Sequence, residues 1–323
     1  MAVLLSGCYE EFTPETDVNP VLCVNSLITA GEPIEVRVSR THLYTEDNFA
    51  DYSVKDAEVR IYANGELKGA DYIPQEGDDI RIEVQSSRYG TAEAEVKVPE
   101  SVPAKSLSLR PLLLDEWRLE NPDGSMAGGI SFNLGVDMEI DDPGAVENYY
   151  RLSILGFNYG GEADDEESSN ATHIDFSPGE FKYEAEPIFG EHIGVFDSVM
   201  GNDNFGFTFF TDRQFSGSSY TLHLVFNNGR YSFSISDGWQ SEYLDCGLIL
   251  TLHTVSQSYY NWVNYLWQRD DGILGDINNI GFGDPMWGYS NVSTGAGVVA
   301  AQSCREYIVS LREFIESVLK KDY

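Results

Sequence analysis

The alternation of apolar and polar residues between positions 20 and 100 constrains the fold of this chain more than any other feature of its sequence. Ile34, Val36 and Val38 alternate with polar residues, and the same pattern recurs over 57–62 and 80–98. A period of two places the apolar side chains on one face of an extended strand. Turn residues such as the pair Asn64-Gly65 separate these segments. The pattern predicts a mainly-β fold, with an immunoglobulin-like sandwich over residues 20–100.

A second and larger β-rich domain is predicted over residues 101–323. Its candidate strands cover residues 106–114, 130–140, 149–157, 205–211, 219–227, 230–236 and 246–255. They are short runs of β-branched and aromatic residues bounded by turn residues, and Asn228-Gly229 is a hairpin signal. The acidic run at residues 162–169 lacks apolar periodicity and is predicted to be a loop.

Two helices are expected within this second domain, over residues 257–268 and 307–321. Ser256 is a candidate N-cap for the first helix, and four apolar residues then follow at helical spacing. These residues are Tyr259, Trp262, Val263 and Leu266. They form one apolar face of the helix, which is expected to pack on the second domain. The second helix is predicted from the spacing of Ile308, Leu311, Ile315 and Val318.

The charge of the chain excludes several classes of partner. The 323 residues include 20 Lys and Arg against 53 Asp and Glu, which gives a formal net charge of −33. Phosphate backbones and anionic lipid headgroups both attract basic surfaces, so we expect neither nucleic acid nor an anionic bilayer surface to bind this chain. Aromatic residues make up 13% of the sequence, which favours a folded protein over a disordered one. The sequence contains no apolar stretch long enough to predict a membrane-spanning helix.

The first residues resemble the lipobox of a bacterial lipoprotein. Leu5-Ser6-Gly7 precedes Cys8, whose sulfur would carry the lipid, with acyl chains such as palmitate as the anchor. Residues 1–8 are therefore predicted to be the end of a signal peptide, although no basic n-region precedes them. Glu10 and Glu11 resemble a surface-export signal, and residues 9–19 would form a tether. These features predict an outer-membrane protein that faces the cell exterior.

Three further cysteines, Cys23, Cys246 and Cys304, match no zinc-binding spacing. Buried thiols and a Cys246–Cys304 disulfide are both compatible with their positions.

No catalytic or metal-binding motif is evident. Adjacent aspartates such as Asp141-Asp142 would point to opposite faces of a strand, and Asp142-Pro143-Gly144 is typical of a turn. His223 and His253 fall in predicted strands, where packing roles are expected. Acidic segments at 164–167 and 202–204 offer oxygen ligands for calcium, but solvated loops are the simpler interpretation. We therefore expect a protein that is not an enzyme and that requires no cofactor or metal.

A loop over residues 284–297 is the candidate partner-contact surface. Trp287 and Tyr289 lie there between Pro and Gly residues, which favours exposure of their rings. Exposed rings of this kind stack on sugar faces or anchor protein contacts.

Taken in order, several segments resemble the Bacteroidota lipoprotein family of the domain of unknown function 4249. They are residues 8–12, 20–29, 88–92, 141–144, 148–150, 210–217 and 290–297. Cys23 and the pair Val298-Val299 depart from the usual family residues. The resemblance implies a non-enzymatic accessory or binding partner of a TonB-dependent outer-membrane transporter in nutrient uptake. A surface structural or adhesion protein and a secreted glycan-acting hydrolase remain alternatives.

Overall fold

The structure is a computed structural model. It describes residues 19–43, 46, 50–124, 126–158, 172–175, 186–190, 208–225, 231–235, 246–270, 288–310 and 313. Over these residues the fold is mainly β, as the sequence predicts. Three sheets and one longer helix make up the described part of the chain.

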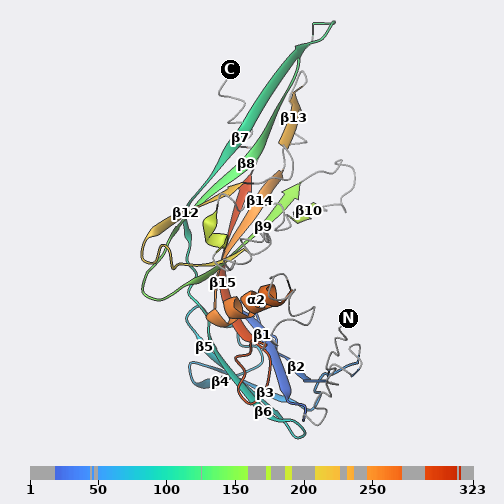
Figure 1. Ribbon diagram of the computed structural model, residues 1–323, viewed down its shortest axis with the longest axis vertical. Helices are drawn as coiled ribbons and strands as arrows, with labels where there is room; N and C mark the ends of the chain where they lie inside the picture. The colour runs from blue at the N-terminus through green and yellow to red at the C-terminus, as the bar shows by residue number, and fades with distance from the viewer. Residues whose placement is uncertain are drawn as a thin grey trace, which may run out of the picture.

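A long central sheet runs through the body of the molecule (Figure 1). Its strands lie in the order β10 (Thr172–Asp175), β9 (Tyr149–Asn158), β14 (Cys246–Val255), β15 (Val299–Ser310), β1 (Leu22–Thr29) and β2 (Arg37–Arg40), and β11 (Phe209–Thr211) pairs with β9. Strand β15 pairs in parallel with β1 through its first residues and antiparallel with β14 along the rest of its length. The central sheet is therefore built from the first and last described strands together.

The N-terminal sandwich forms where one face of the central sheet meets a second sheet. This sheet contains β4 (Glu66–Lys68), β3 (Glu58–Ala63), β5 (Asp79–Ser86) and β6 (Gly90–Lys97), in that order. The alternating apolar residues Ile80, Ile82 and Val84 are buried in its core, as their period of two predicts. Asn64 and Gly65 both have positive φ angles in the β3–β4 turn, which explains the Asn-Gly pair there.

A third sheet packs on the other half of the same face of the central sheet. It contains β7 (Ala104–Glu120), β8 (Met126–Asp141), β12 (Ser219–Val225) and β13 (Tyr231–Ile235). The β7–β8 hairpin projects from the body in Figure 1. Ala301 of β15 lies in the N-terminal core, whereas Tyr307 and Val309 pack on the second core. Because these three residues share a strand face, one face of β15 contributes to both cores.

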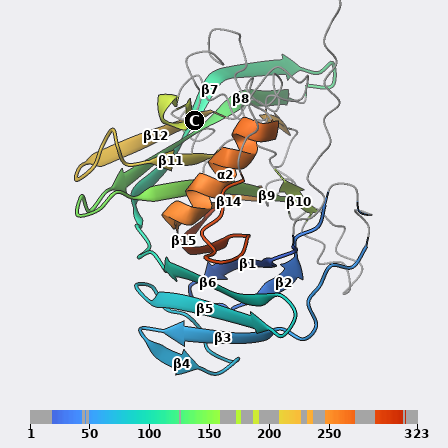
Figure 2. The same ribbon diagram turned by 60° about the horizontal axis from the view of Figure 1, so that its bottom comes forward.

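Helix α2 (Gln257–Asp270) covers the opposite face of the central sheet. Figure 2 shows α2 and the sheet of β3–β6 on opposite sides of β1 and β15. Ser256 caps the helix as predicted, because its Oγ accepts the Tyr259 amide at 3.3 Å. A short 3-10 helix, η3 (Pro187–Gly190), borders the second core.

The contact face of α2 is rotated from the predicted one. Tyr259, Tyr260 and Trp267 are buried, whereas Trp262 is half-buried at the edge of the cluster. The aromatic cluster also includes Tyr149 and Phe209 from one end of the central sheet, and Val298 and Ala300 from the other. The helix therefore packs across both parts of the chain and not on the second domain alone.

The prediction of a helix over 307–321 is wrong at its start. Residues 307–310 complete strand β15, where Tyr307 and Val309 face the core and the side chain of Ile308 is 68% exposed. Alternate burial is the pattern of a strand, and pairing with β14 overrides the helical spacing of the apolar residues. Of the residues beyond 310, the structure describes Glu313, which is helical.

A Cys246–Cys304 disulfide is excluded by the strand register. Cys304 lies opposite His253, whereas Gly247 lies opposite Ser310. The two cysteines are therefore about 20 Å apart along the strands, far beyond the Cα separation that a disulfide spans. Cys304 is an exposed free thiol and Cys23 a partly buried one.

The sandwich expected over residues 20–100 includes a segment from the other end of the sequence. Val292, Val299 and Ala301 lie in its core, and β15 supplies a strand of its central sheet. The core of this sandwich therefore includes residues from outside the range 20–100.

Candidate functional site: a groove beside helix α2

The residues predicted to carry the lipid anchor and the export signal, Cys8, Glu10 and Glu11, lie outside the described residues, and so does Trp287. Tyr289 is described and is half-buried. Its side chain packs on the aromatic cluster beneath α2. Tyr289 therefore supports the helix as well as bordering the surface.

The segment from Ser290 to Gly297 is bound closely to the N-terminal sandwich. The Ala296 carbonyl accepts the Val24 amide at 2.8 Å, and the Thr294 hydroxyl donates to the Thr91 carbonyl at 2.7 Å. Gly297 has a φ of +111°, and a Cβ there would lie 2.2 Å from the Val24 oxygen. Only glycine allows the chain to approach β1 so closely. This part of the predicted docking loop is thus a structural connection to β15.

Two motifs that carry the family resemblance meet in one buried hydrogen-bond network. Asp142 accepts hydrogen bonds from the Tyr150 hydroxyl at 2.6 Å, the Asn148 amide at 3.1 Å and the backbone N–H groups of Gly144 and Gly217. Asp212 accepts the Asn148 backbone N–H at 3.0 Å. The side chains of Asp142 and Asp212 are nearly inaccessible to solvent. The network therefore holds two chain segments together and presents no carboxylate pair to a substrate.

The pKa values of this network follow from its burial. Burial raises the pKa of Asp212 above its ordinary value, the nearby Asp142 charge adds to the increase, and the Asn148 amide opposes it. Burial and the hydrogen bond to Asp142 raise the pKa of Tyr150 well above its ordinary value. Outside the network, Glu147 forms an ion pair with Arg213 at 2.7 Å.

The two strand histidines have different roles. His253 is buried, and its Nε2 lies 3.0 Å from the Ser153 hydroxyl, which agrees with the packing role expected for it. Burial, together with the charge of Arg151, lowers the pKa of His253 to about 4. His223 is instead exposed and lies 2.7 Å from an Asp137 carboxylate oxygen, so the packing role expected for it is wrong. Among the described residues, no group of three His, Cys, Asp or Glu side chains could hold a metal ion.

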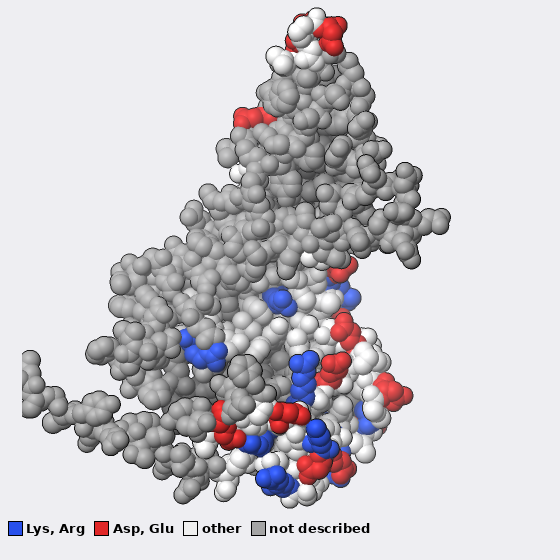
Figure 3. Space-filling view, turned by 90° about the vertical axis from the view of Figure 1, so that its right-hand side faces the viewer, with Lys and Arg blue, Asp and Glu red and all other residues white. Residues whose placement is uncertain are grey.

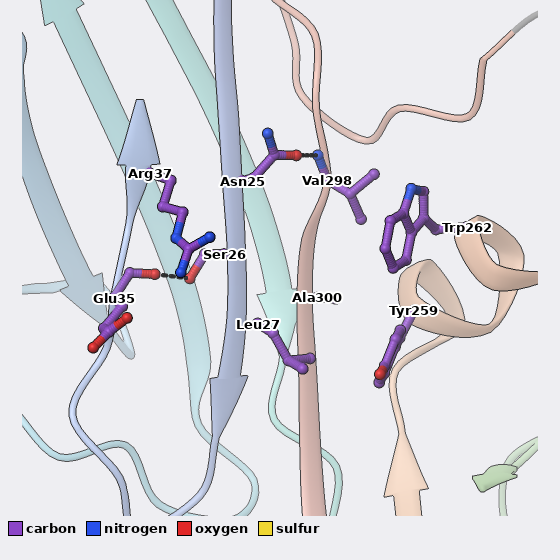
Figure 4. A pocket seen from close by; sticks show the side chains of 9 residues that line it. All are labelled: Asn25, Ser26, Leu27, Glu35, Arg37, Tyr259, Trp262, Val298 and Ala300. Atoms are coloured by element: carbon purple, nitrogen blue, oxygen red, sulfur yellow. Dashed lines mark hydrogen bonds between the residues drawn. The ribbon is translucent and has the colours of Figure 1, made fainter. Parts of the chain in front are cut away.

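A groove beside helix α2 is a candidate binding site in the described part of the molecule. Its volume is about 470 Å³, within the range of small-molecule sites. Figure 4 shows its floor on β1 and β15, with α2 on one side and β2 on the other. The lining residues are Asn25, Ser26, Leu27, Glu35, Arg37, Tyr259, Trp262, Val298 and Ala300. We refer to this set as the α2 groove.

One wall of the α2 groove is aromatic. The Tyr259 and Trp262 rings lie 6.3 Å apart with an interplanar angle of 28°. Tyr259 is fixed by an edge contact with Phe209 at 5.3 Å, whereas Trp262 remains partly accessible. Leu27 on the floor is 44% exposed, which adds apolar surface beside the rings. An apolar ligand face can therefore contact this wall.

The opposite wall is polar. Glu35 and Arg37 are exposed, and within the described residues their side chains form no ion pair or hydrogen bond. The Ser26 hydroxyl donates to the Glu35 carbonyl at 2.8 Å, which fastens this wall to β1. The Asn25 Oδ1 atom accepts the Val298 amide at 3.0 Å, so the amide orientation of Asn25 is fixed.

A larger cleft of about 920 Å³ lies where the sandwich meets the second core. Its lining includes Pro99, Glu100, Val146, Glu147 and Tyr289. Val146 is 66% exposed, whereas Glu147 is engaged by Arg213 and by the Tyr149 hydroxyl at 2.9 Å.

Sequence reasoning missed most of the α2 groove. The helical spacing predicts Trp262 on the packed apolar face of a helix, and Arg37 and Leu27 belong to strands with no distinguishing motif. One signal of the groove is present in the sequence, because the apolar Leu27 occupies an outward-facing position of an alternating strand. The burial pattern of β1 shows that Leu27 is exposed.

Figure 3 shows the charges of the described surface. Lys and Arg side chains lie among Asp and Glu side chains over the sandwich. Arg81, for example, contacts Glu83 and lies 3.3 Å from Glu93 across the strands. Helices of the described residues are too short and too polar to cross a membrane.

Comparison with known proteins identifies the family of the chain. No curated protein matches the chain. The family model described as a domain of unknown function, DUF4249, matches residues 9–308, which is most of the chain. The protein therefore belongs to the DUF4249 family.

Proposed function

We propose that this protein is a lipid-anchored outer-membrane binding protein that acts as a non-enzymatic accessory partner of a TonB-dependent transporter. The observation that carries the binding role is the α2 groove, where Trp262, Leu27 and Arg37 present surface that the described residues do not cover. Such a preformed site with few fixed polar groups is typical of ligand binding. The accessory role rests on the family resemblance, because similar proteins are commonly encoded beside these transporters.

The position of the groove suits a membrane-anchored protein. Cys8 is the proposed site of lipid attachment, and strand β1 begins at Leu22. Thirteen residues separate Cys8 from β1, and they reach at most about 45 Å when extended. The α2 groove on β1 would therefore stay near the bilayer and near a transporter in the same membrane. Confinement raises the effective concentration of two such partners, so a weak direct contact suffices.

The anchoring is tested by expressing the gene with its full upstream signal and comparing Cys8→Ala with the parent in membrane fractions. We expect the parent in the outer membrane and the variant in soluble fractions. Cys23→Ala is the matched control, because this thiol lies within β1. Retention of Cys8→Ala in the membrane would contradict the proposed anchor. Protease treatment of intact cells tests separately whether the protein, with Glu10 and Glu11 as its export signal, faces the cell exterior.

The partnership is tested by isolating the lipidated protein from native outer membranes after solubilisation in mild detergent. We expect a TonB-dependent β-barrel to co-isolate. Replacement of Trp287 and Tyr289 by Ala tests the predicted contact loop, and a fully retained barrel would place the contact elsewhere. Absence of any barrel from repeated native isolations would refute the partnership.

A surface adhesion role is a second candidate, favoured by the β7–β8 hairpin. The two strands contain 17 and 16 residues, and the residues of the turn at Pro122–Gly124 are exposed. A hairpin of this length extends for about 55 Å. Shortening it should reduce adhesion without affecting co-isolation of a barrel if the two roles are separate.

A further inference from the structure

We propose that the α2 groove binds an uncharged oligosaccharide, with one sugar face against Trp262 and the sugar hydroxyls against Arg37 and Glu35. This inference rests on the proposed function, because it names the ligand class of the same groove. It follows from the chemistry of the two walls and from the way the protein fixes them.

The aromatic wall provides a flat apolar surface of limited extent. The Trp262 and Tyr259 rings are within 28° of parallel, and Figure 4 shows both beside the floor of the groove. The Tyr259 ring is buried, whereas Trp262 is partly accessible, so Trp262 is the ring that a ligand can cover. Flat aromatic faces gain contact area at low entropic cost when a flat apolar surface packs on them. The C–H face of a pyranose ring has this shape.

The polar wall determines the charge of the ligand. Glu35 lies two residues before Arg37, which is the first residue of β2, and both residues line the groove. Their charges are opposite. An anionic ligand would therefore be repelled by Glu35, and a cationic ligand would be repelled by Arg37. A purely apolar ligand would remove both charges from water without providing partners, which is costly. An uncharged ligand with both donors and acceptors avoids these costs.

Hydroxyl groups meet this requirement. Each sugar hydroxyl both donates and accepts, so it can donate to the Glu35 carboxylate and accept from the Arg37 guanidinium. The Asn25 amide adds a donor. Its Oδ1 accepts the Val298 amide, and among the described residues its Nδ2 has only the weak acceptor Cys23 Sγ, 3.4 Å away. Within the described contacts, the Arg37 guanidinium and the Asn25 Nδ2 atom therefore remain available as donors on this side of the groove, and the Glu35 carboxylate remains available as an acceptor.

The groove is also held in shape before any ligand binds. The Ser26–Glu35 hydrogen bond joins the polar wall to the floor, and the Tyr259–Phe209 contact joins the aromatic wall to the central sheet. A site that is already ordered loses less conformational entropy on binding. This favours recognition of a small ligand over docking of a large flexible partner.

The test uses the purified full chain and a panel of uncharged hexasaccharides with different linkages: maltohexaose, cellohexaose, laminarihexaose, mannohexaose and xylohexaose. Binding is measured by isothermal titration calorimetry. We expect at least one member of the panel to bind. Trp262→Leu retains apolar volume but not the ring and should weaken binding by about two- to tenfold, whereas Trp262→Phe should retain most of the affinity.

Arg37→Gln tests the polar wall, with Arg60→Gln as its matched control. Arg60 is an exposed arginine on β3, outside the groove. We expect weaker binding for Arg37→Gln and unchanged binding for Arg60→Gln, with circular dichroism melting curves showing that each variant is folded.

Four results would overturn the inference. They are no binding by any uncharged hexasaccharide, equal binding by the parent and Trp262→Leu, equal binding by the parent and Arg37→Gln, or preferential binding of hexagalacturonate, chitosan hexamer or an apolar peptide. Failure of this inference is distinguishable from failure of the proposed function. If no saccharide binds but a barrel still co-isolates from membranes, the saccharide ligand is rejected and the proposed partnership with the transporter stands.

Discussion

Replacing Asp142 by Asn should strongly destabilise the protein, although the change removes only one charge. The Asp142 side chain is 6% exposed, and both its oxygens accept hydrogen bonds. One oxygen accepts from the Tyr150 hydroxyl and the Asn148 amide, and the other accepts from the backbone N–H groups of Gly144 and Gly217. An asparagine places an NH2 group where one of these oxygens was, facing two donors.

The magnitude follows from this geometry. Two hydrogen bonds to a charged acceptor are lost in either orientation of the amide, and the donors left behind are buried. At about 1.5–3 kcal/mol for each such bond, we expect a loss of about 3–6 kcal/mol in the free energy of unfolding. A domain with a typical stability of about 5–15 kcal/mol would then be close to unfolding.

The assay is urea denaturation followed by circular dichroism, with Asp141→Asn as the control. Asp141 is the adjacent residue, but it is exposed and one of its oxygens accepts the Ser219 hydroxyl at 2.7 Å. A change at such a surface position is usually worth about 0.5 kcal/mol or less. A loss below about 1 kcal/mol for Asp142→Asn, or equal losses for both variants, would refute the role assigned to the network.

Three further predictions follow from the same structure. Burial raises the folded-state pKa of Asp212 above its ordinary value of 3.8. Its contribution to stability is therefore fully present below pH 3.8 and is lost as the pH rises through the raised pKa. The stability of Asp212→Asn relative to the parent should increase with pH over that interval, as measured by urea titrations at several pH values. Gly297→Ala should cost about 2–4 kcal/mol because its Cβ would clash with the Val24 backbone, whereas Gly31→Ala, with a positive φ but open space around it, should cost only about 1 kcal/mol in the same denaturation assay. Residues 20–100 expressed alone should lack a cooperative thermal transition, because Val292, Val299 and Ala301 are missing from their core; a sharp transition by circular dichroism would show that the sandwich is autonomous after all.

The individual strands could be predicted because their burial is local and periodic. Ile80, Ile82 and Val84 alternate with polar residues, and the structure buries each of them on one face of β5. The Asn64-Gly65 turn was equally predictable, since positive φ at both positions favours these two residues. In such cases the side chain and its environment are determined within a few residues of sequence.

The pairing of strands was not predictable in the same way. Strand β1 pairs with β15, and the paired residues Ser26 and Val299 are separated by 273 positions in the sequence. No local pattern encodes a partner at that distance. The error at residues 307–310 has the same origin, because the spacing of Ile308 and later apolar residues fits a helix until pairing with β14 determines the conformation.

The α2 groove depends on this long-range pairing. Its polar wall comes from residues near position 36, its aromatic wall from residues near 260, and part of its floor from Val298 and Ala300. The floor exists only when β15 lies beside β1, and Gly297 permits that approach by passing against the Val24 backbone. A ligand bound across the groove would therefore contact both strands of this pair and α2 at once. Such a ligand would stabilise the junction between the first and last strands, and the site would be lost whenever that junction opened.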